Sequence, residues 1–353
     1  MVIPFTRRVR SQAIGICMAL LPIVAACQGS GEAEIGAPPS ARASTLVIGA
    51  YTTPREVFSQ EILPSFAAHW REETGEAVSF EESYAGSGAQ ARAVIGGFKA
   101  DVVALSLEPD VQRVAEAGLI THAWEDGPHG GIVSRSFVVL AVRPGNPKGL
   151  RGWEDLARPD VKILTPNVRT SGGAMWNVAA IWGAALRGHA GAPAGDEAAA
   201  TALLAKILRN VEVMDKGARD SILTFERGIG DVAITYENEV LVAQRAGEAM
   251  EYLMPSSTIL IESPAAVVDV YAQERGNLEV AQAFVRFLHG PVAQQAYARY
   301  GLRPVDERFT PQGLAAPADA FTIRDLGGWA AIQASLFADG GAYDQALAAA
   351  RRQ

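Results

Sequence analysis

The sequence lacks the usual markers of several enzyme classes. It contains no H-E-x-x-H, no G-x-S-x-G and no P-loop motif, so nothing points to a zinc protease, a serine hydrolase or a P-loop NTPase. It also lacks an excess of basic residues, because 31 Lys and Arg stand against 39 Asp and Glu, which gives a formal net charge of −8. An acidic chain of this kind argues against nucleic acid as a partner.

The N-terminus has the pattern of a lipoprotein export signal. Three arginines precede an apolar run over residues 13–24, which is too short to cross a hydrocarbon core of ~30 Å as a helix. The run leads into V-A-A-C, which resembles a bacterial lipoprotein cleavage box ending at Cys27. We therefore expect residues 1–26 to be a signal peptide that is removed and Cys27 to receive a lipid. The mature protein would then be periplasmic or at the cell surface, anchored to a membrane.

Cysteine is nearly absent from the rest of the chain. Cys17 would leave with the signal and Cys27 would be lipidated, so we expect no disulfide in the mature protein. Residues 27–44 are small, polar and rich in Pro and Gly, which is the composition of a flexible tether. For the apolar run before Cys27, the alternative to a signal peptide is a buried core helix with an incidental cysteine. Without a disulfide, the core alone must stabilise the fold.

From residue 45 onward, apolar β-type runs alternate with helical ones. The clearest helix carries Phe58, Ile62, Phe66 and Trp70 at a spacing of four and ends near Gly75. The expected strands cover residues 45–50, 78–82, 101–107, 136–143, 162–165, 211–214, 231–236 and 265–271. Such alternation predicts an α/β fold with mainly parallel sheets covered by helices. The apolar strands at 136–143 and 265–271 are candidates for crossings between two lobes.

Several short segments share a strand that ends in small or polar residues where a helix begins. They contain T-T-P-R-E after Tyr51, G-S-G-A-Q around Ser87, T-S-G-G-A around Ser171, G-A-R around Ala218, and Y-E-N-E from Tyr236. The Thr53/Glu56 and Ser87/Gln90 pairs have capping-box spacing. The first turn of a helix exposes unpaired N–H groups and a partial positive charge, so several such ends together would bind an anion without a lysine or arginine. Each segment by itself also fits an ordinary capped helix.

Two other functions remain open. G-S-G-A-Q-A fits the G-x-G-x-x-A dinucleotide fingerprint of a nucleotide-dependent enzyme, although the nearby Asp101 lies only 13 positions after Gly88 rather than about 20. His122, Asp126 and His129 contain metal-ligand side chains, but they fall in a Gly/Pro-rich loop without regular spacing. Solvated loop histidines are the simpler interpretation, and we expect no metal and no cofactor.

Taken together, the segments resemble the periplasmic sulfate/thiosulfate-binding proteins of ABC transporters. The resemblance runs from residue 45 to about 345 through FAAHWREETG, GSGAQARAVI, ADVVALSL, VRPGNPKGLRGWEDL, ILTPNVRTSGGAMWN, GARDSILTFERGIGDVAITYENE and FTIRDLGGWAAIQASLFADGGAYDQ. It implies a type II periplasmic binding protein and not an enzyme, with a sulfate or thiosulfate anion and an ABC permease as partners. The implied lobes are 45–135 with 266–353 and 136–265, joined by the two crossing strands. We expect a monomer.

The resemblance also implies the ligand-binding residues. Matched motif by motif, the donors are Ser87 and Tyr236 through side chains, and Thr52, Ser171, Gly172, Gly173 and Ala218 through backbone N–H groups.

Departures from the family pattern keep other ligands open. Tyr236 stands where the family has a tryptophan and Thr52 where it often has an aspartate. A tyrosine donor resembles the related molybdate binders, so molybdate or tungstate remains an alternative. Phosphate is a weaker one, which depends on Asp220 facing the site, whereas a solvent-facing carboxylate at a helix start is the simpler interpretation.

Overall fold

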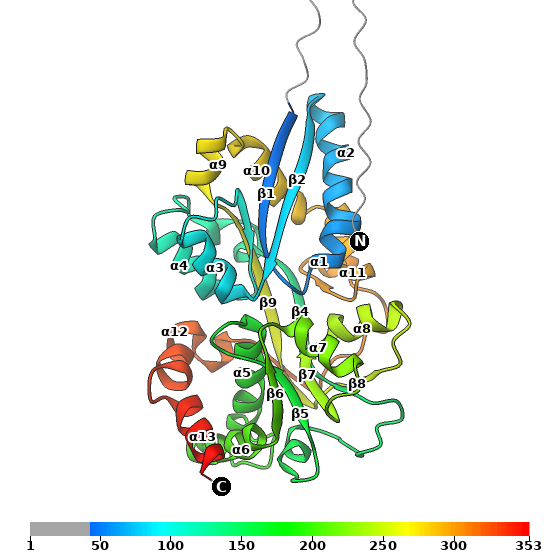
Figure 1. Cartoon of the computed structure of the whole chain (residues 1–353), viewed down its shortest axis with the longest axis vertical. Coiled ribbons are helices and arrows are strands. Elements are labelled where there is room, and N and C mark those ends of the chain that lie inside the picture. The colour runs from blue at the N-terminus through cyan, green and yellow to red at the C-terminus, as the bar shows by residue number, and fades with distance from the viewer. Residues whose placement is uncertain (1–42, 353) are drawn as a thin grey trace, which may run out of the picture. The chain divides into compact units, whose positions relative to one another are not determined.

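Strands and helices alternate along residues 43–352, the part of the chain that this computed structural model describes (Figure 1). The signal, Cys27 and nearly all of the expected tether lie outside these residues. The strands are β1 Ala43–Tyr51, β2 Ala77–Ala85, β3 Val102–Ala104, β4 Ile132–Val142, β5 Ile163–Pro166, β6 Val211–Asp215, β7 Val232–Tyr236, β8 Glu251–Leu253, β9 Ser257–Val267, β10 Arg303–Pro304 and β11 Asp319–Phe321.

The helices occupy the segments between these strands. The α-helices are α1 Arg55–Val57, α2 Leu63–Thr74, α3 Ser87–Ile95, α4 Glu108–Glu116, α5 Gly172–Leu186, α6 Glu197–Arg209, α7 Ala218–Glu226, α8 Glu237–Arg245, α9 Asp269–Arg275, α10 Leu278–Leu288, α11 Pro291–Arg299, α12 Gly328–Ile332 and α13 Ala342–Arg351. Short π-helices lie at η1 Phe58–Ile62 and η7 Gln333–Phe337. Short 3₁₀ helices lie at η2 Trp124–Asp126, η3 Pro128–Gly131, η4 Trp153–Ala157, η5 Glu307–Phe309 and η6 Arg324–Leu326. No helix among the described residues is long and apolar enough to span a membrane.

The helix predicted from the spacing of four is present. Its four apolar side chains are all buried, and it ends at Gly75 with a φ of 76°, the left-handed conformation that favours glycine. Its first part is the π-helix η1, which continues directly into α2. A π-helix has more residues per turn than an α-helix, so it keeps side chains four residues apart on one face.

One predicted strand was placed wrongly. We expected a strand over 265–271, but β9 runs over Ser257–Val267 and Asp269 begins α9. Ser263 and Pro264 interrupt the apolar pattern and hide the first half of the strand. The Asp269 carboxylate accepts the N–H of Thr121 at 2.7 Å, so it contributes to the packing that ends the strand and starts the helix.

The sheet is mixed rather than simply parallel. The strand order is β2-β1-β3-β9-β4-β7-β5-β6. The pairs β1–β2, β1–β3, β5–β6 and β5–β7 are parallel, whereas β3–β9, β9–β4 and β4–β7 are antiparallel. Two parallel groups are therefore joined by the antiparallel strands β4 and β9.

β4 and β9 each change pairing partner along their length. β4 pairs with β9 over residues 132–137 and with β7 over 138–142. β9 pairs with β4 over 260–264 and with β3 over 265–267. Figure 1 shows both strands running from the part of the described chain that carries β1 to the part that carries β5. They thus connect the two parallel groups. The crossings predicted at residues 136–143 and 265–271 overlap β4 and only the last three residues of β9.

The C-terminal helices α12 and α13 pack with α5 and α6, whereas the resemblance implied that residues 266–353 belong with residues 45–135. Trp329 in α12 packs edge-on against Trp176 in α5 with ring centroids 4.7 Å apart. Phe321, Tyr343 and Ala346 belong to the same buried apolar cluster as Trp176. Figure 1 shows α12 and α13 beside α5 and α6. The end of the chain thus helps to bury the β5–β6–β7 group.

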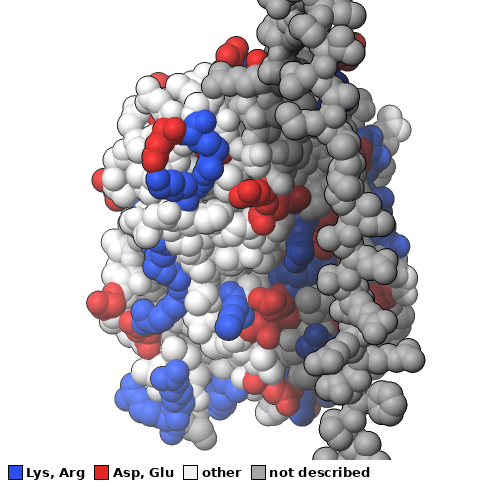
Figure 2. Space-filling view, turned by 45° about the horizontal axis from the view of Figure 1, so that its top comes forward, with Lys and Arg blue, Asp and Glu red and all other residues white. Residues whose placement is uncertain are grey.

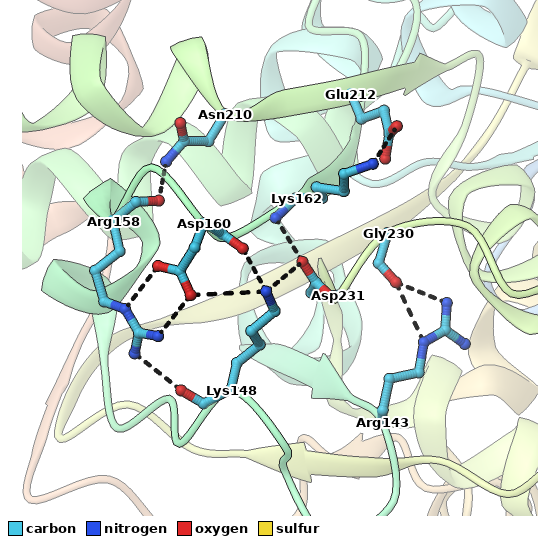
Figure 3. A network of polar contacts seen from close by, with 9 residues as sticks. All are labelled: Arg143, Lys148, Arg158, Asp160, Lys162, Asn210, Glu212, Gly230 and Asp231. Atoms are coloured by element: carbon cyan, nitrogen blue, oxygen red, sulfur yellow. Dashed lines mark hydrogen bonds and ion pairs between the residues drawn. The ribbon is translucent and has the colours of Figure 1, made fainter.

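Ion pairs and a hydrogen bond link the segments that precede β5 and β7 (Figure 3). Lys148 lies between the carboxylates of Asp160 and Asp231, at 3.6 and 3.5 Å, and the backbone N–H of Lys162 donates to Asp231 at 2.9 Å. Exposed pairs of this kind stabilise little individually. On the face shown in Figure 2, acidic and basic side chains are interspersed without a continuous basic band, which agrees with the acidic composition.

Candidate functional site

Four helices begin at the strand ends that the sequence singled out. The N-cap residues are Gly86 for α3, Ser171 for α5, Gly217 for α7 and Tyr236 for α8. At none of these four does the N-cap side chain accept a hydrogen bond from the helix. The first N–H groups of these helices are therefore left for a ligand or for water.

Both expected capping boxes are wrong. Ser87 is the first residue of α3, not its cap, and its hydroxyl donates to Asp110 at 2.5 Å. Pro54 is the N-cap of α1, and Glu56 accepts a hydrogen bond from Arg219 at 2.7 Å. The side chains have long-range partners instead of the local backbone because buried groups across the fold lie within reach.

Three of the helix starts meet around Gly173. A β-carbon built on Gly173 would lie 2.8 Å from Cε2 of Tyr236, 3.2 Å from Cβ of Ala218 and 3.3 Å from Oγ of Ser171. These distances are shorter than ordinary van der Waals contact. Glycine is therefore required here because the starts of α7 and α8 crowd against the start of α5.

Gly172 explains why the motif has two glycines. A β-carbon on Gly172 would lie 2.7 Å from Oγ of Ser106 and 2.8 Å from Cγ of Leu107, residues that follow β3. Gly86 is similar, because a β-carbon there would collide with the carbonyl oxygen of Thr170. Each glycine thus allows a close approach to a different neighbour, which a structural cap alone would not need.

Thr52 and Ser87 complete the cluster from the other parallel group. Oγ1 of Thr52 lies 3.5 Å from the position of a β-carbon on Gly217. Oγ of Ser87 accepts the N–H of Ser106 at 3.0 Å, and Ser106 in turn contacts Tyr236. All seven residues predicted from the motifs therefore lie in one contiguous cluster. Every one of them except the partly exposed Thr52 is buried.

Two buried carboxylates beside the cluster are each paired with an arginine. Asp110 is 1% exposed and forms an ion pair with Arg113. Arg219 lies 3.0 Å from Glu239, which is fully buried, and also binds Glu56. Burial raises the pKa of both Asp110 and Glu239, and the neighbouring arginine opposes this in each case. The seven candidate residues themselves carry no charge at neutral pH.

Tyr236 is held as a neutral phenol. It is 1% exposed, and burial raises its pKa well above the usual value for a phenol. Its hydroxyl lies 2.7 Å from the Ser106 hydroxyl. Asp220, by contrast, is exposed in the first turn of α7. Its Oδ2 nevertheless lies 3.2 Å from the position of a β-carbon on Gly217, from which Oγ1 of Thr52 lies 3.5 Å, so the phosphate alternative stays a prediction.

Ser106 and Asp110 were not predicted from the sequence. Ser106 lies two residues after β3 ends at Ala104, which resembles the strand-end position of the other candidates, so its place was a usable signal. Asp110 gave no signal, because its contact with Ser87 depends on how α3 and α4 pack. Trp176 is fully buried and donates its ring N–H to the Ser106 carbonyl at 2.9 Å.

A cavity of about 430 Å³ adjoins the cluster. Gly88, Ser171 and Gly172 line one side of it, and Arg92 and Arg169 lie on its wall. The candidate metal residues lie elsewhere: His122 binds Asp269 at 2.7 Å, and His129 stacks on His289. Within residues 43–352 no three His, Cys, Asp or Glu side chains are grouped as metal ligands.

Comparison with known proteins agrees with this geometry. The chain matches the family described as bacterial extracellular solute-binding protein over residues 46–303. It is 42% identical to a sulfate-binding protein of Synechococcus elongatus, over 97% of each chain. It is 35% identical to a thiosulfate-binding protein of Escherichia coli, over 88% of this chain and 93% of that protein.

A solved structure supports the same relationship. The sulfate-binding protein SubI from Mycobacterium tuberculosis H37Rv superposes with a TM-score of 0.77 at 34% identity, over 84% of this chain and 100% of SubI. The similarity to sulfate- and thiosulfate-binding proteins predicted from the motifs is confirmed, and so is the predicted fold class. This chain belongs to the bacterial extracellular solute-binding protein family and has the α/β fold of its type II binding proteins.

Proposed function

We propose that the protein captures sulfate, or thiosulfate, outside the cytoplasm and delivers it to the permease of an ABC transporter. The observation that carries this proposal is the convergence of four uncapped helix starts on a buried cluster without its own charge. The names of the relatives, sulfate-binding and thiosulfate-binding protein, support the choice of anion.

The proposed donors follow from the cluster. Tyr236 donates its hydroxyl hydrogen, and Thr52, Gly172, Gly173 and Ala218 donate backbone N–H groups. Ser87 joins them when its hydroxyl exchanges the bond to Asp110 for one to the anion, and Ser171 when its N–H exchanges the bond to the Asn167 carbonyl at 2.9 Å. Hydrogen bonds to an ionised acceptor contribute about 1.5–3 kcal/mol each, and helix starts add a partial positive charge. Several together offset the large free energy of dehydrating a dianion.

The absence of a formal positive charge favours selectivity. Sulfate at neutral pH has no proton and only accepts hydrogen bonds, so a set of donors satisfies it fully. Monohydrogen phosphate carries one proton, and leaving it without an acceptor costs about 1–3 kcal/mol, which corresponds to roughly 10–100-fold weaker binding.

Capture would proceed by closure of two lobes. We propose a first lobe built on β1–β3 and a second on β5–β7, with β4 and β9 as the hinge. The packing of Trp329 on Trp176 favours placing the C-terminal helices with the second lobe rather than with the first. Because the proposed donors come from both groups of strands, the anion stabilises the closed state, which the permease would recognise.

The remaining parts of the proposal concern the N-terminus and the assembly state. We propose that lipid on Cys27 anchors the protein to a membrane and that the protein acts as a monomer. Molybdate or tungstate is the second candidate ligand, which the phenol of Tyr236 favours. Binding of nucleotide at G-S-G-A-Q-A is the alternative from another class.

Isothermal titration of the purified protein tests the proposal. Sulfate, thiosulfate, molybdate, phosphate and NAD are each titrated into the ligand-free protein. We expect heat and saturable binding with sulfate or thiosulfate, and weaker binding of phosphate. Tightest binding of molybdate would reassign the ligand, and binding of NAD without any oxyanion would refute the proposal.

A further inference from the structure

Ser106 lies between Ser87 and Tyr236 and forms a hydrogen bond with each of them. It follows β3 and is 1% exposed. Its N–H donates to Ser87, its carbonyl accepts the ring N–H of Trp176, and its hydroxyl lies 2.7 Å from that of Tyr236. The two backbone hydrogen bonds hold the Ser106 backbone in place and so fix the position of its hydroxyl beside Tyr236.

We infer that Ser106 is a positioning residue that decides whether Tyr236 offers a hydrogen or a lone pair to the bound oxyanion, an inference that rests on the proposed function. Two hydroxyl groups joined by one hydrogen bond contain two hydrogens, and one of them lies between the oxygens. Either oxygen fits the role of donor. The pair therefore has two orientations of similar geometry.

The two orientations suit different ligands. When Ser106 donates to Tyr236, the phenol hydrogen points to the ligand and matches a fully deprotonated oxyanion such as sulfate. When Tyr236 donates to Ser106, the phenol oxygen presents a lone pair and accepts the proton of monohydrogen phosphate. An indole N–H in the same place only donates. The tyrosine and serine together therefore make the site less selective for sulfate over phosphate.

The residues around Ser106 and Tyr236 allow the hydrogen bond between them to reverse by movement of hydrogens alone. The Tyr236 ring rests against Gly173, where no β-carbon fits, so the ring has little room to move. Ser87 does not compete for the Ser106 hydroxyl, because its own hydroxyl donates to Asp110 and its oxygen accepts the Ser106 N–H. The phenol stays protonated because its burial is complete. Reversal of the pair thus needs no movement of heavy atoms.

The test compares ligands in Ser106→Ala and in matched variants. Titrations use sulfate, molybdate and phosphate at mildly alkaline pH, where phosphate is mostly the monohydrogen dianion. In Ser106→Ala the phenol hydrogen loses its alternative acceptor, so phosphate affinity should fall by about tenfold, the effect of one unmade hydrogen bond. Sulfate and molybdate need only the donor, so their affinities should fall by about twofold. The sulfate-to-phosphate affinity ratio therefore rises.

Two further variants control for packing. Ser263→Ala removes another buried serine hydroxyl that binds a tyrosine, Tyr51, at 3.0 Å, and it should leave the ratio unchanged. Ser106→Cys fills similar space but bonds weakly, so it should raise the ratio by a smaller factor and covers the case in which the alanine variant does not fold.

The outcomes separate the two claims. Equal loss for all three anions in Ser106→Ala, or no detectable phosphate binding by the wild-type protein that binds sulfate, overturns the role of Ser106. A wild-type protein that binds neither sulfate nor thiosulfate overturns the proposed function itself.

Discussion

Gly172→Ala should block closure without unfolding the protein. The new β-carbon would lie 2.7 Å from Oγ of Ser106 and 2.8 Å from Cγ of Leu107, whereas ordinary contacts are about 3.5–4.0 Å. Overpacking of this kind costs about 1–3 kcal/mol. Because Gly172 and Ser106 belong to different proposed lobes, this free energy should be lost mainly from the closed, liganded state. Affinity for sulfate should fall by about 5- to 150-fold.

The same substitution should leave the ligand-free protein as stable as before or slightly more so. Gly172 does not have a positive φ, and alanine at a compatible position stabilises by about 0.4–1 kcal/mol by restricting the unfolded chain. The matched control is Gly152→Ala, because a β-carbon there meets nothing within 4 Å. Calorimetry gives the affinity, urea unfolding gives the stability, and small-angle scattering with saturating sulfate reports closure.

The result that would refute this reasoning is specific. If Gly172→Ala binds sulfate as tightly as the control, the contact with Ser106 does not belong to the liganded state. If the ligand-free variant loses as much unfolding free energy as it loses binding free energy, the contact belongs to the fold and not to closure.

Three other predictions follow from the ion pairs and the N-terminus. Arg219→Met should lower the unfolding free energy by about 3 kcal/mol, because it leaves the buried Glu239 without its cation. Urea unfolding should show that adding Glu239→Gln restores part of this stability. An Arg219→Met variant as stable as wild type would contradict the prediction. Arg187, with help from Ser257, lowers the pKa of Asp319 from 3.8 to about 2, so the pair stabilises the fold above about pH 4 and this contribution is lost as the pH falls towards 2. Arg187→Gln should therefore be less stable than wild type at neutral pH by less than about 1 kcal/mol, since the Arg187 and Asp319 side chains are 33% and 18% exposed, and a difference that persists in acid would exclude this cause. Cys27→Ala should move the protein from the membrane fraction to the soluble fraction of fractionated cells, and continued membrane association would exclude the lipid anchor.

The sequence by itself determined the features that depend on neighbours along the chain. The spacing of Phe58, Ile62, Phe66 and Trp70 predicted a helix ending at Gly75 because one face of a helix repeats about every four residues. The strand ends at Tyr51 and Tyr236 were placed well because apolar runs end there in small or polar residues. Motif similarity then supplied the family and the seven candidate residues, which lie together in the structure.

Only the tertiary structure decided which of those strand ends lie next to one another. Ser106 and Tyr236 are separated by 130 positions, yet their hydroxyl groups meet, and no local pattern could indicate that contact. The same holds for the roles of Gly172 and Gly173, for the ion pair of Arg219 with Glu239, and for the packing of Trp329 on Trp176. Local backbone preferences fix where a helix begins, whereas the strand order and the packing of helices fix which helices begin at the same place.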